Sequence, residues 1–142
     1  KRIFAAIPAL REKLGDRPVL RAMHFFGDNA RVAAQVALLR EEDLNFLNMI
    51  KASGDSSFKY LQNVYTNRDV QNQAVSIALA VSENVLETME YAVAWSGFAG
   101  TIQAFVKNDF VEEYRKALDA VFGEGSCHVL KVRKYGGMKV IA

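Results

Sequence analysis

The sequence predicts an α+β fold: a small antiparallel sheet of four strands covered on one face by helices, with extra helices at the N-terminal end. Apolar residues recur at three- and four-residue spacing through residues 3–89, which is the period of helices with one buried face. After residue 90, short β-prone runs alternate with glycine-containing turns and one further helical segment. Helices followed by strand, loop, strand, helix, strand and strand form the order expected of an α+β domain.

The first two helices are expected to be separated by a glycine. Residues 3–13 form a short apolar-rich segment that we expect to be helical and to end near Gly15. Asp16 is expected to cap the second helix, because its side chain suits the free N–H groups of a first turn. Pro18 fits that first turn, where its missing N–H costs nothing. The helical pattern then continues to about Arg40.

A third helix is expected after Asp43, which would act as its N-cap. Its apolar face should comprise Leu44, Leu47, Ile50 and Phe46. The polar run Ser53–Ser57 favours a break in this helix, since serine and aspartate side chains compete for backbone hydrogen bonds. A loop is expected over residues 63–68.

The most regular helical pattern follows Asp69, which is expected to cap it. Its apolar residues recur at three- and four-residue spacing, so they should form one buried stripe. That stripe comprises Ala74, Ile77, Ala78, Val81, Val85 and Met89.

The period of the pattern changes after this helix. Residues 91–95 and 101–106 are short β-prone runs on either side of the segment 96–100. Apolar side chains alternate in the second run, as they do in a strand with one buried face. Residues 128–133 and 138–141 are expected to form the third and fourth strands.

A last helix should lie between the second and third strands. It is expected to start at Asn108 or Asp109, and Asp109 with Glu112 forms a plausible capping box. Gly123 lies where a glycine ends many helices. The inner face of this helix should comprise Val111, Tyr114, Leu118, Val121 and Phe122.

The composition indicates one domain spanning residues 1–142. Apolar residues make up 51% of the chain and charged residues 24%, which supports a real core and argues against disorder. Eighteen basic and sixteen acidic residues give a net charge of +2, without the basic stripe typical of nucleic-acid binding. The longest apolar runs, such as Ala74–Val81, are far shorter than a membrane span. We therefore expect neither a nucleic-acid partner nor a membrane partner.

Cysteine usage suggests a reducing compartment. Cys127 is the only cysteine, so no internal disulfide can form and a thiolate zinc site is not expected. A cytoplasmic location is the natural expectation. The chain opens on Lys1 without a methionine or a signal-peptide pattern, which suggests a domain taken from a longer protein.

Two histidines invite a catalytic or metal-binding interpretation. His24 lies among apolar and aromatic neighbours, and we favour a packed histidine bonded to an acceptor over a catalytic base. His128 follows Cys127 directly, and adjacent residues on a strand point to opposite faces. They would not close on one ion, so no metal site is expected.

Two further groups of residues have both a functional and a structural interpretation. Ser53–Ser57 could cradle an anion, although a helix break is favoured. Trp95 with Tyr91 and Phe98 could stack on a base or a sugar, although aromatic side chains on strands more often belong to the core.

The order of several motifs resembles one enzyme family. Residues 96–106, Ser-Gly-Phe-Ala-Gly-Thr-Ile-Gln-Ala-Phe-Val, resemble the third motif of the GHMP kinases in its galactokinase form. Residues 20–26 with 29–32, Leu-Arg-Ala-Met-His-Phe-Phe and Asn-Ala-Arg-Val, resemble the galactokinase helix that carries an Arg-Ala-x-His pattern. The stretches 53–57 and 61–65 resemble the segment that follows this helix. The resemblance covers nearly the whole chain in order.

This resemblance implies the C-terminal, ferredoxin-like lobe of a two-domain kinase that transfers the γ-phosphate of ATP to the C1 hydroxyl of galactose. In that family the glycine- and serine-rich loop that holds ATP and Mg lies in the N-terminal half, with the aspartate base. No Pro-x-x-x-Gly-Leu-Ser-Ser-like or Gly-Lys-Ser/Thr segment occurs in this chain. We therefore expect neither ATP nor Mg to be bound by this lobe and no catalytic residue within it.

The resemblance also assigns a site and partners. The substrate- and phosphate-side loop would comprise Ser96, Gly97, Phe98, Ala99 and Gly100. Without the resemblance, a tight turn between two strands is the favoured interpretation of this segment. The expected partner is the missing N-terminal lobe, and the face exposed by its absence could support a homodimer.

The third motif departs from the family pattern. Where the family has three glycines, this chain has Trp95, Ser96 and Gly97, and an arginine position is Ala92. Either the loop has degenerated, or a short deletion around Glu90–Trp95 has shifted the alignment. The alternatives to a kinase lobe are therefore a degenerate, non-catalytic module that binds a sugar, or a domain that only packs on a partner.

Overall fold

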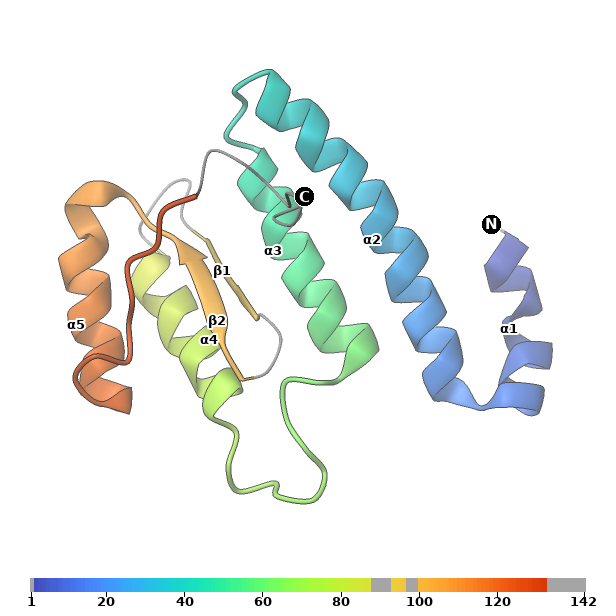
Figure 1. Ribbon diagram of the computed structural model, residues 1–142. Coiled ribbons are helices and arrows are strands. Elements are labelled where there is room, and N and C mark those ends of the chain that lie inside the picture. Colours follow the sequence, from blue (N-terminus) through green and yellow to red (C-terminus); the bar gives the residue numbers. More distant parts are fainter. Residues whose placement is uncertain (1, 88–92, 97–99, 133–142) are drawn as a thin grey trace, which may run out of the picture.

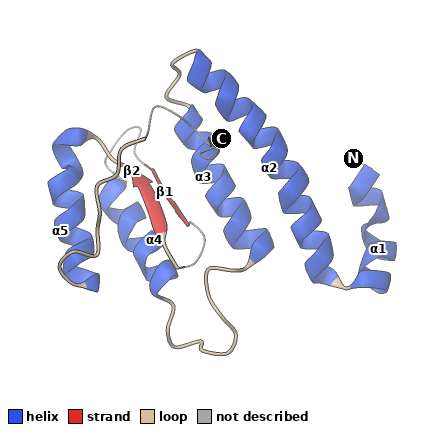
Figure 2. Cartoon of the chain, viewed as in Figure 1, coloured by secondary structure: helices blue, strands red, loops and turns tan. Residues whose placement is uncertain are grey.

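The computed structural model describes residues 2–87, 93–96 and 100–132. Helices dominate these residues, as Figures 1 and 2 show. The elements in chain order are α1 (Arg2–Leu14), α2 (Asp16–Arg40), α3 (Phe46–Ser56) with a π-helical turn (Ser57–Leu61), α4 (Ala74–Leu86), β1 (Val93–Ser96), β2 (Ile102–Phe105), a 3-10 turn (Asn108–Phe110) and α5 (Val111–Phe122).

The predicted four-stranded sheet with helices on one face is wrong. Within the described residues the sheet is the single antiparallel pair β1–β2, in a register that places Val93 opposite Phe105 and Ser96 opposite Ile102. The predicted third strand has no strand pairing over its described part, residues 128–132. The predicted fourth strand, 138–141, lies outside the described residues.

The error at the third strand has a physical cause. Residues 128–132 belong to a β-prone run, but a strand needs a neighbouring strand for its N–H and C=O groups. Val129, Leu130 and Val132 are 63%, 79% and 92% exposed, so neither face of this segment is covered. A β-prone run therefore does not by itself make a strand of a sheet.

The elements form a row of layers. Counting from the N-terminal side, α1 lies beside α2, α2 packs on α3, and α3 packs on β1 (Figure 1). Helix α4 packs on β1 and β2, and α5 packs on α4. The hairpin is therefore held between α3 on one side and α4 on the other.

The tightest part of the core lies between α4 and α5. Leu86, Tyr114 and Leu118 are at most 6% exposed and form its centre. The half-buried residues packed around them are Ala78, Val81, Val85, Ala104, Val106, Ala117 and Cys127. The inward-facing residues of the hairpin thus belong to the same core as the two helices.

A polar pair is buried in this core. Ser82 is 0% exposed, and its hydroxyl lies 2.8 Å from the hydroxyl of Tyr114. A buried hydroxyl without a partner costs free energy, so each side chain satisfies the other. Burial raises the pKa of Tyr114, although the bond from Ser82 opposes that shift.

The predicted apolar faces are correct only in part. In α4, Ala78, Val81 and Val85 pack in the core, whereas Ala74 and Ile77 are exposed and Met89 lies outside the described residues. In α5 the buried residues are Tyr114 and Leu118, with Val111 half-buried, while Val121 and Phe122 are 50% and 38% exposed. In α3, Leu47 is buried, whereas Leu44 precedes the helix and is 49% exposed.

Three predicted helix caps are wrong. Asp16 is the first residue of α2 and pairs with Arg11 of α1 instead, and Gly15 precedes the helix with φ of 80°. Asp69 accepts a hydrogen bond from Asn72, and α4 begins later, at Ala74. No side-chain cap bond is made at the start of the 3-10 turn or of α5, so Asp109 forms no capping box.

The predicted helix end at Gly123 is confirmed, whereas the predicted Asp43 cap is also wrong: α3 begins at Phe46, and Asn45 precedes it without a side-chain cap bond. Gly123 has φ of 98°, and its N–H donates to the carbonyl of Asp119 at 2.8 Å. Asp43 Oδ1 accepts a hydrogen bond from the N–H of Asn45 at 2.8 Å, in the turn that leads into α3. No helix among the described residues is long and apolar enough to cross a membrane.

Candidate functional site

The predicted substrate-side loop connects the two strands of the hairpin. Ser96 is the last residue of β1 and pairs with Ile102 at the start of β2. Gly100 has φ of 80°, a left-handed conformation that glycine adopts without the strain of a side chain. Gly97, Phe98 and Ala99 lie outside the described residues. The structure thus places both ends of the loop at one end of the hairpin.

The departure from the galactokinase motif falls inside the strand. Trp95 pairs with Gln103, and Ser96 pairs with Ile102, as regular positions of β1. Two positions where the family keeps glycine are therefore strand residues in this chain. Tyr91 and Ala92 lie outside the described residues.

The hairpin is held against α3 by an aromatic contact. The ring of Phe46, at the start of α3, meets the ring of Phe105 at the end of β2 edge to face, with 5.7 Å between the ring centroids. Edge-to-face packing of this kind is a favourable geometry for two aromatic rings. It anchors the end of the hairpin that lies away from the loop.

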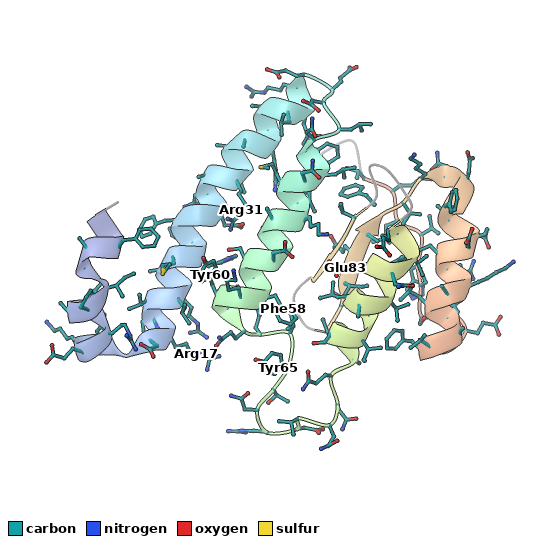
Figure 3. The ribbon with its side chains drawn as sticks, turned by 180° about the vertical axis from the view of Figure 1, so that it is seen from behind. Arg17, Arg31, Phe58, Tyr60, Tyr65 and Glu83 are labelled. Carbon is teal, nitrogen blue, oxygen red and sulfur yellow. The ribbon has the colours of Figure 1, made fainter. Side chains whose placement is uncertain are left out.

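A second set of polar residues lies between α2 and α3, and we call it the α2–α3 polar cluster. It comprises His24, Asp28 and Arg31 of α2 with Ser53 and Ser56 of α3. The three α2 residues follow one another at spacings of four and three, so they share one face of the helix. In Figure 3, Arg31 lies between the two helices.

Within this cluster, His24 is bonded to α3. Its Nδ1 lies 3.0 Å from the hydroxyl oxygen of Ser56, which is 6% exposed. The prediction of a packed histidine with a hydrogen-bond partner is therefore confirmed. Its partner, Ser56, belongs to the run Ser53–Ser57, for which the sequence predicts a helix break.

Asp28 holds the other half of the cluster. Its Oδ1 accepts hydrogen bonds from Arg31 Nε, at 3.1 Å, and from the hydroxyl of Ser53. Arg31 Nη2 also lies 3.0 Å from this oxygen, yet it is buried and makes no hydrogen bond among the described residues. The Asp28 and Arg31 side chains are 29% and 21% exposed, so this ion pair is more shielded than a surface pair.

The predicted break at Ser53–Ser57 is wrong, and these bonds give the reason. Helix α3 continues through Ser56 and then through the π-helical turn to Leu61. Ser53 and Ser56 direct their hydroxyls to side chains of α2, so these groups do not compete for the backbone of their own helix. The spacing of His24, Asp28 and Arg31 on one face was the available sequence signal for this cluster.

A third polar group lies at the C-terminal end of α5. Asp119 Oδ1 accepts hydrogen bonds from the hydroxyl of Ser126 at 2.9 Å and from the N–H of Cys127 at 3.2 Å. The Ser126 bond is the main cause of a lowered pKa for Asp119, with help from Cys127 and nearby Arg115. Burial, followed by the Asp119 charge, raises the pKa of Cys127. A thiol held neutral in this way is a poor nucleophile at neutral pH.

The lowered pKa of Asp119 predicts a contribution to acid sensitivity. Because its pKa is lower in the folded chain than in the unfolded chain, its stabilising effect is present above the unfolded pKa and is lost as pH falls through the folded pKa. We expect Asp119→Asn to lose less stability than the parent chain between pH 7 and pH 3, measured by urea unfolding. Asp109→Asn, on the exposed 3-10 turn, controls for the loss of one charge. An equal loss in parent and Asp119→Asn would contradict this assignment.

Metal-binding residues do not converge in the described parts of the chain. No group of three or more His, Cys, Asp or Glu side chains there could hold an ion. His128 is exposed, and Cys127 packs at the edge of the core.

The fold defines a mainly helical domain with one β-hairpin, whose loop ends and inter-helix polar cluster are its candidate functional features. Searches of protein families, of curated proteins and of solved structures find no match to this chain.

Proposed function

We propose that this chain is the C-terminal lobe of a galactokinase-like sugar kinase, which in the cytoplasm would phosphorylate galactose at C1 together with an N-terminal lobe. The observation that carries the proposal is spatial. Three segments that resemble galactokinases, 20–26, 53–57 and the hairpin around 96–100, are far apart in sequence and are joined through α3.

The first junction is the α2–α3 polar cluster. The Arg-Ala-x-His pattern ends on His24, and this side chain is bonded to Ser56 in the second resembling segment. Such a direct bond supports a shared origin for the two patterns, because unrelated local similarities have no reason to meet. The cluster also fixes the position of α3 along α2.

The second junction is the contact of α3 with the hairpin. The Phe46–Phe105 contact and the packing of α3 on β1 hold the hairpin relative to the α2–α3 pair. The loop ends at Ser96 and Gly100 are thereby presented by packed elements on both sides. A rigid support of this kind suits a wall of a substrate cleft.

ATP and Mg would be held by the N-terminal lobe. The residues present here do not fit either group, since the sequence has no phosphate-binding glycine loop and the described residues have no cluster of carboxylates for a cation. Phosphoryl transfer depends on positioning the phosphates and stabilising their charge. The lobe would therefore shape the cleft and would not turn over substrate alone.

The test is galactose-dependent ADP production. We expect none from this chain alone and none from the N-terminal lobe of a galactokinase alone, because each lacks one wall of the cleft. Joined in one polypeptide, the two should release ADP when galactose and Mg-ATP are present. Turnover by this chain alone, or a folded joined protein without turnover, would overturn the proposal.

A second candidate function is a non-catalytic module that binds a sugar. The observation that favours it is the placement of Trp95 and Ser96 as paired strand residues where the family has glycines. Calorimetry distinguishes the two: this candidate requires heat of binding with galactose in the isolated chain, and absence of heat would exclude it.

A further inference from the structure

The outward face of α2 is apolar along most of its length. The exposed residues of α2 between Phe25 and Leu39 are Phe25, Phe26, Asn29, Ala30, Val32, Ala33, Val36, Ala37 and Leu39. The charged residues in this span are Asp28 and Arg31, and both are paired with each other in the α2–α3 polar cluster. Between Phe25 and Leu39, α2 therefore directs its two charged side chains toward α3 and a set of apolar side chains to the surface, the reverse of an ordinary surface helix.

These exposed residues contain a regular repeat, which we call the α2 outer stripe: Phe25, Asn29, Val32, Val36 and Leu39. Their spacings of four, three, four and three are those of the a and d positions of a heptad, the pattern of one helix packed along another. The apolar members are 58%, 49%, 43% and 52% exposed. A stripe of this kind fits the same face of a second helix.

The chain also exposes more surface than a self-contained monomer of its size. The accessible surface is 11002 Å² for a mass of 15.8 kDa, whereas a compact monomer of that mass exposes roughly 7,300 Å². A standard protein interface removes about 800 Å² from each partner. The excess is large enough for a stable dimer interface.

The charges at the two ends of the stripe are complementary. Exposed Arg17 and Arg21 precede it, and exposed Arg40, Glu41 and Glu42, one positive and two negative charges, follow it. Arg21 and Glu41 lie at similar distances from Val32, about 16 and 14 Å along the helix axis. Two copies of α2 crossing near Val32 in antiparallel orientation would place the basic end of each beside the acidic end of the other.

A parallel arrangement would oppose like charges at both ends. The surroundings of the stripe leave room for a partner helix along its C-terminal part. Helix α1 lies beside the N-terminal half of α2 and, among the described elements, none covers the C-terminal half on the side away from α3 (Figure 1). An interface of this kind is isologous, the commonest symmetry of homo-oligomers.

We propose that the chain forms a homodimer through the α2 outer stripe, with the two α2 helices antiparallel. This face lies on the opposite side of α3 from the hairpin, so the dimer does not depend on the proposed kinase function.

The test is the oligomeric state of the whole chain by sedimentation equilibrium. We expect a dimer. Val36→Glu should raise the dissociation constant of this dimer at least about tenfold, because the substitution places a charge in the centre of the interface. Val121→Glu is the matched control: Val121 is also a half-exposed valine, 50% against 43% for Val36, and it lies on α5. This control should remain a dimer.

The orientation is tested by charge reversal, at exposed positions where folding is not at risk. Arg21→Glu should weaken the antiparallel dimer several-fold, and Arg21→Glu combined with Glu41→Arg should restore it. A monomeric parent chain, or a dimer unaffected by both Val36→Glu and Arg21→Glu, would overturn the interface. A double variant as weak as Arg21→Glu alone would overturn the antiparallel arrangement.

Discussion

Leu118→Ala is expected to lower the free energy of unfolding by about 2–5 kcal/mol. Leu118 is 5% exposed at the centre of the core, where α5 meets Leu86 of α4. Shortening the side chain removes contacts with both helices and with the hairpin residues packed there. The cost includes the cavity that remains, because close-packed neighbours relax only in part.

Urea unfolding followed by circular dichroism measures this effect. Leu130→Ala is the matched control, since Leu130 is 79% exposed and the change should stay within about 0.5 kcal/mol. Parent and variants are compared at one protein concentration, because self-association would contribute to apparent stability. Similar losses in the two variants would show that the core does not lie between α4 and α5.

Asp28→Ala is expected to lower the free energy of unfolding by about 2 kcal/mol. This value lies between the cost of breaking a surface ion pair and that of breaking a fully buried one. The substitution leaves Arg31 charged at 21% exposure and removes the acceptor of the Ser53 hydroxyl. The substitution therefore weakens the packing of α3 on the face of α2 that also includes His24.

The matched control is Asp55→Ala, which removes a carboxylate from an exposed position of α3. It should leave the urea midpoint nearly unchanged, because surface substitutions of this kind have small effects. If Asp28→Ala were as mild as Asp55→Ala, the α2–α3 polar cluster would not be holding the two helices together.

The helices were the most predictable part of this fold. The three- and four-residue period located α1, α2, α4 and α5 to within a few residues, because it reflects burial of one helix face, a requirement that acts along the whole element. Two strands joined by a glycine-containing turn were also located correctly. Local sequence patterns were therefore sufficient to predict which of these segments are helices and which are strands.

Features that depend on distant partners were not predictable. Asp16 was expected as a cap, but Arg11 competes successfully for its carboxylate, and this pairing lowers the pKa of Asp16. The run Ser53–Ser57 has the composition of a helix break, yet α2 satisfies two of its hydroxyls. The prediction of a third strand failed for the same reason, since a β-prone run at 128–132 does not supply a neighbouring strand.

The candidate site was predictable to different degrees. Gly100 lies in the segment predicted as a tight turn, and its φ of 80° is a conformation that glycine adopts without strain. Asp28 and Arg31 were missed, because a charged pair in a helix more often marks a solvated face. Between Phe25 and Leu39 of α2, by contrast, apolar residues occupy the exposed face and the two charged residues lie on the side of α3.

The measurement closest to the central claim is ADP release by the joined two-lobe protein carrying Gly100→Ala, compared with Gly125→Ala. The two glycines have nearly equal φ, 80° and 82°, and at neither would an added Cβ meet another atom within 4 Å. The backbone strain of the two substitutions is therefore matched, and only Gly100 adjoins the proposed substrate loop. We expect a lower kcat for Gly100→Ala and an unchanged kcat for Gly125→Ala. Equal rates in the two variants would contradict a role for this hairpin in the kinase cleft.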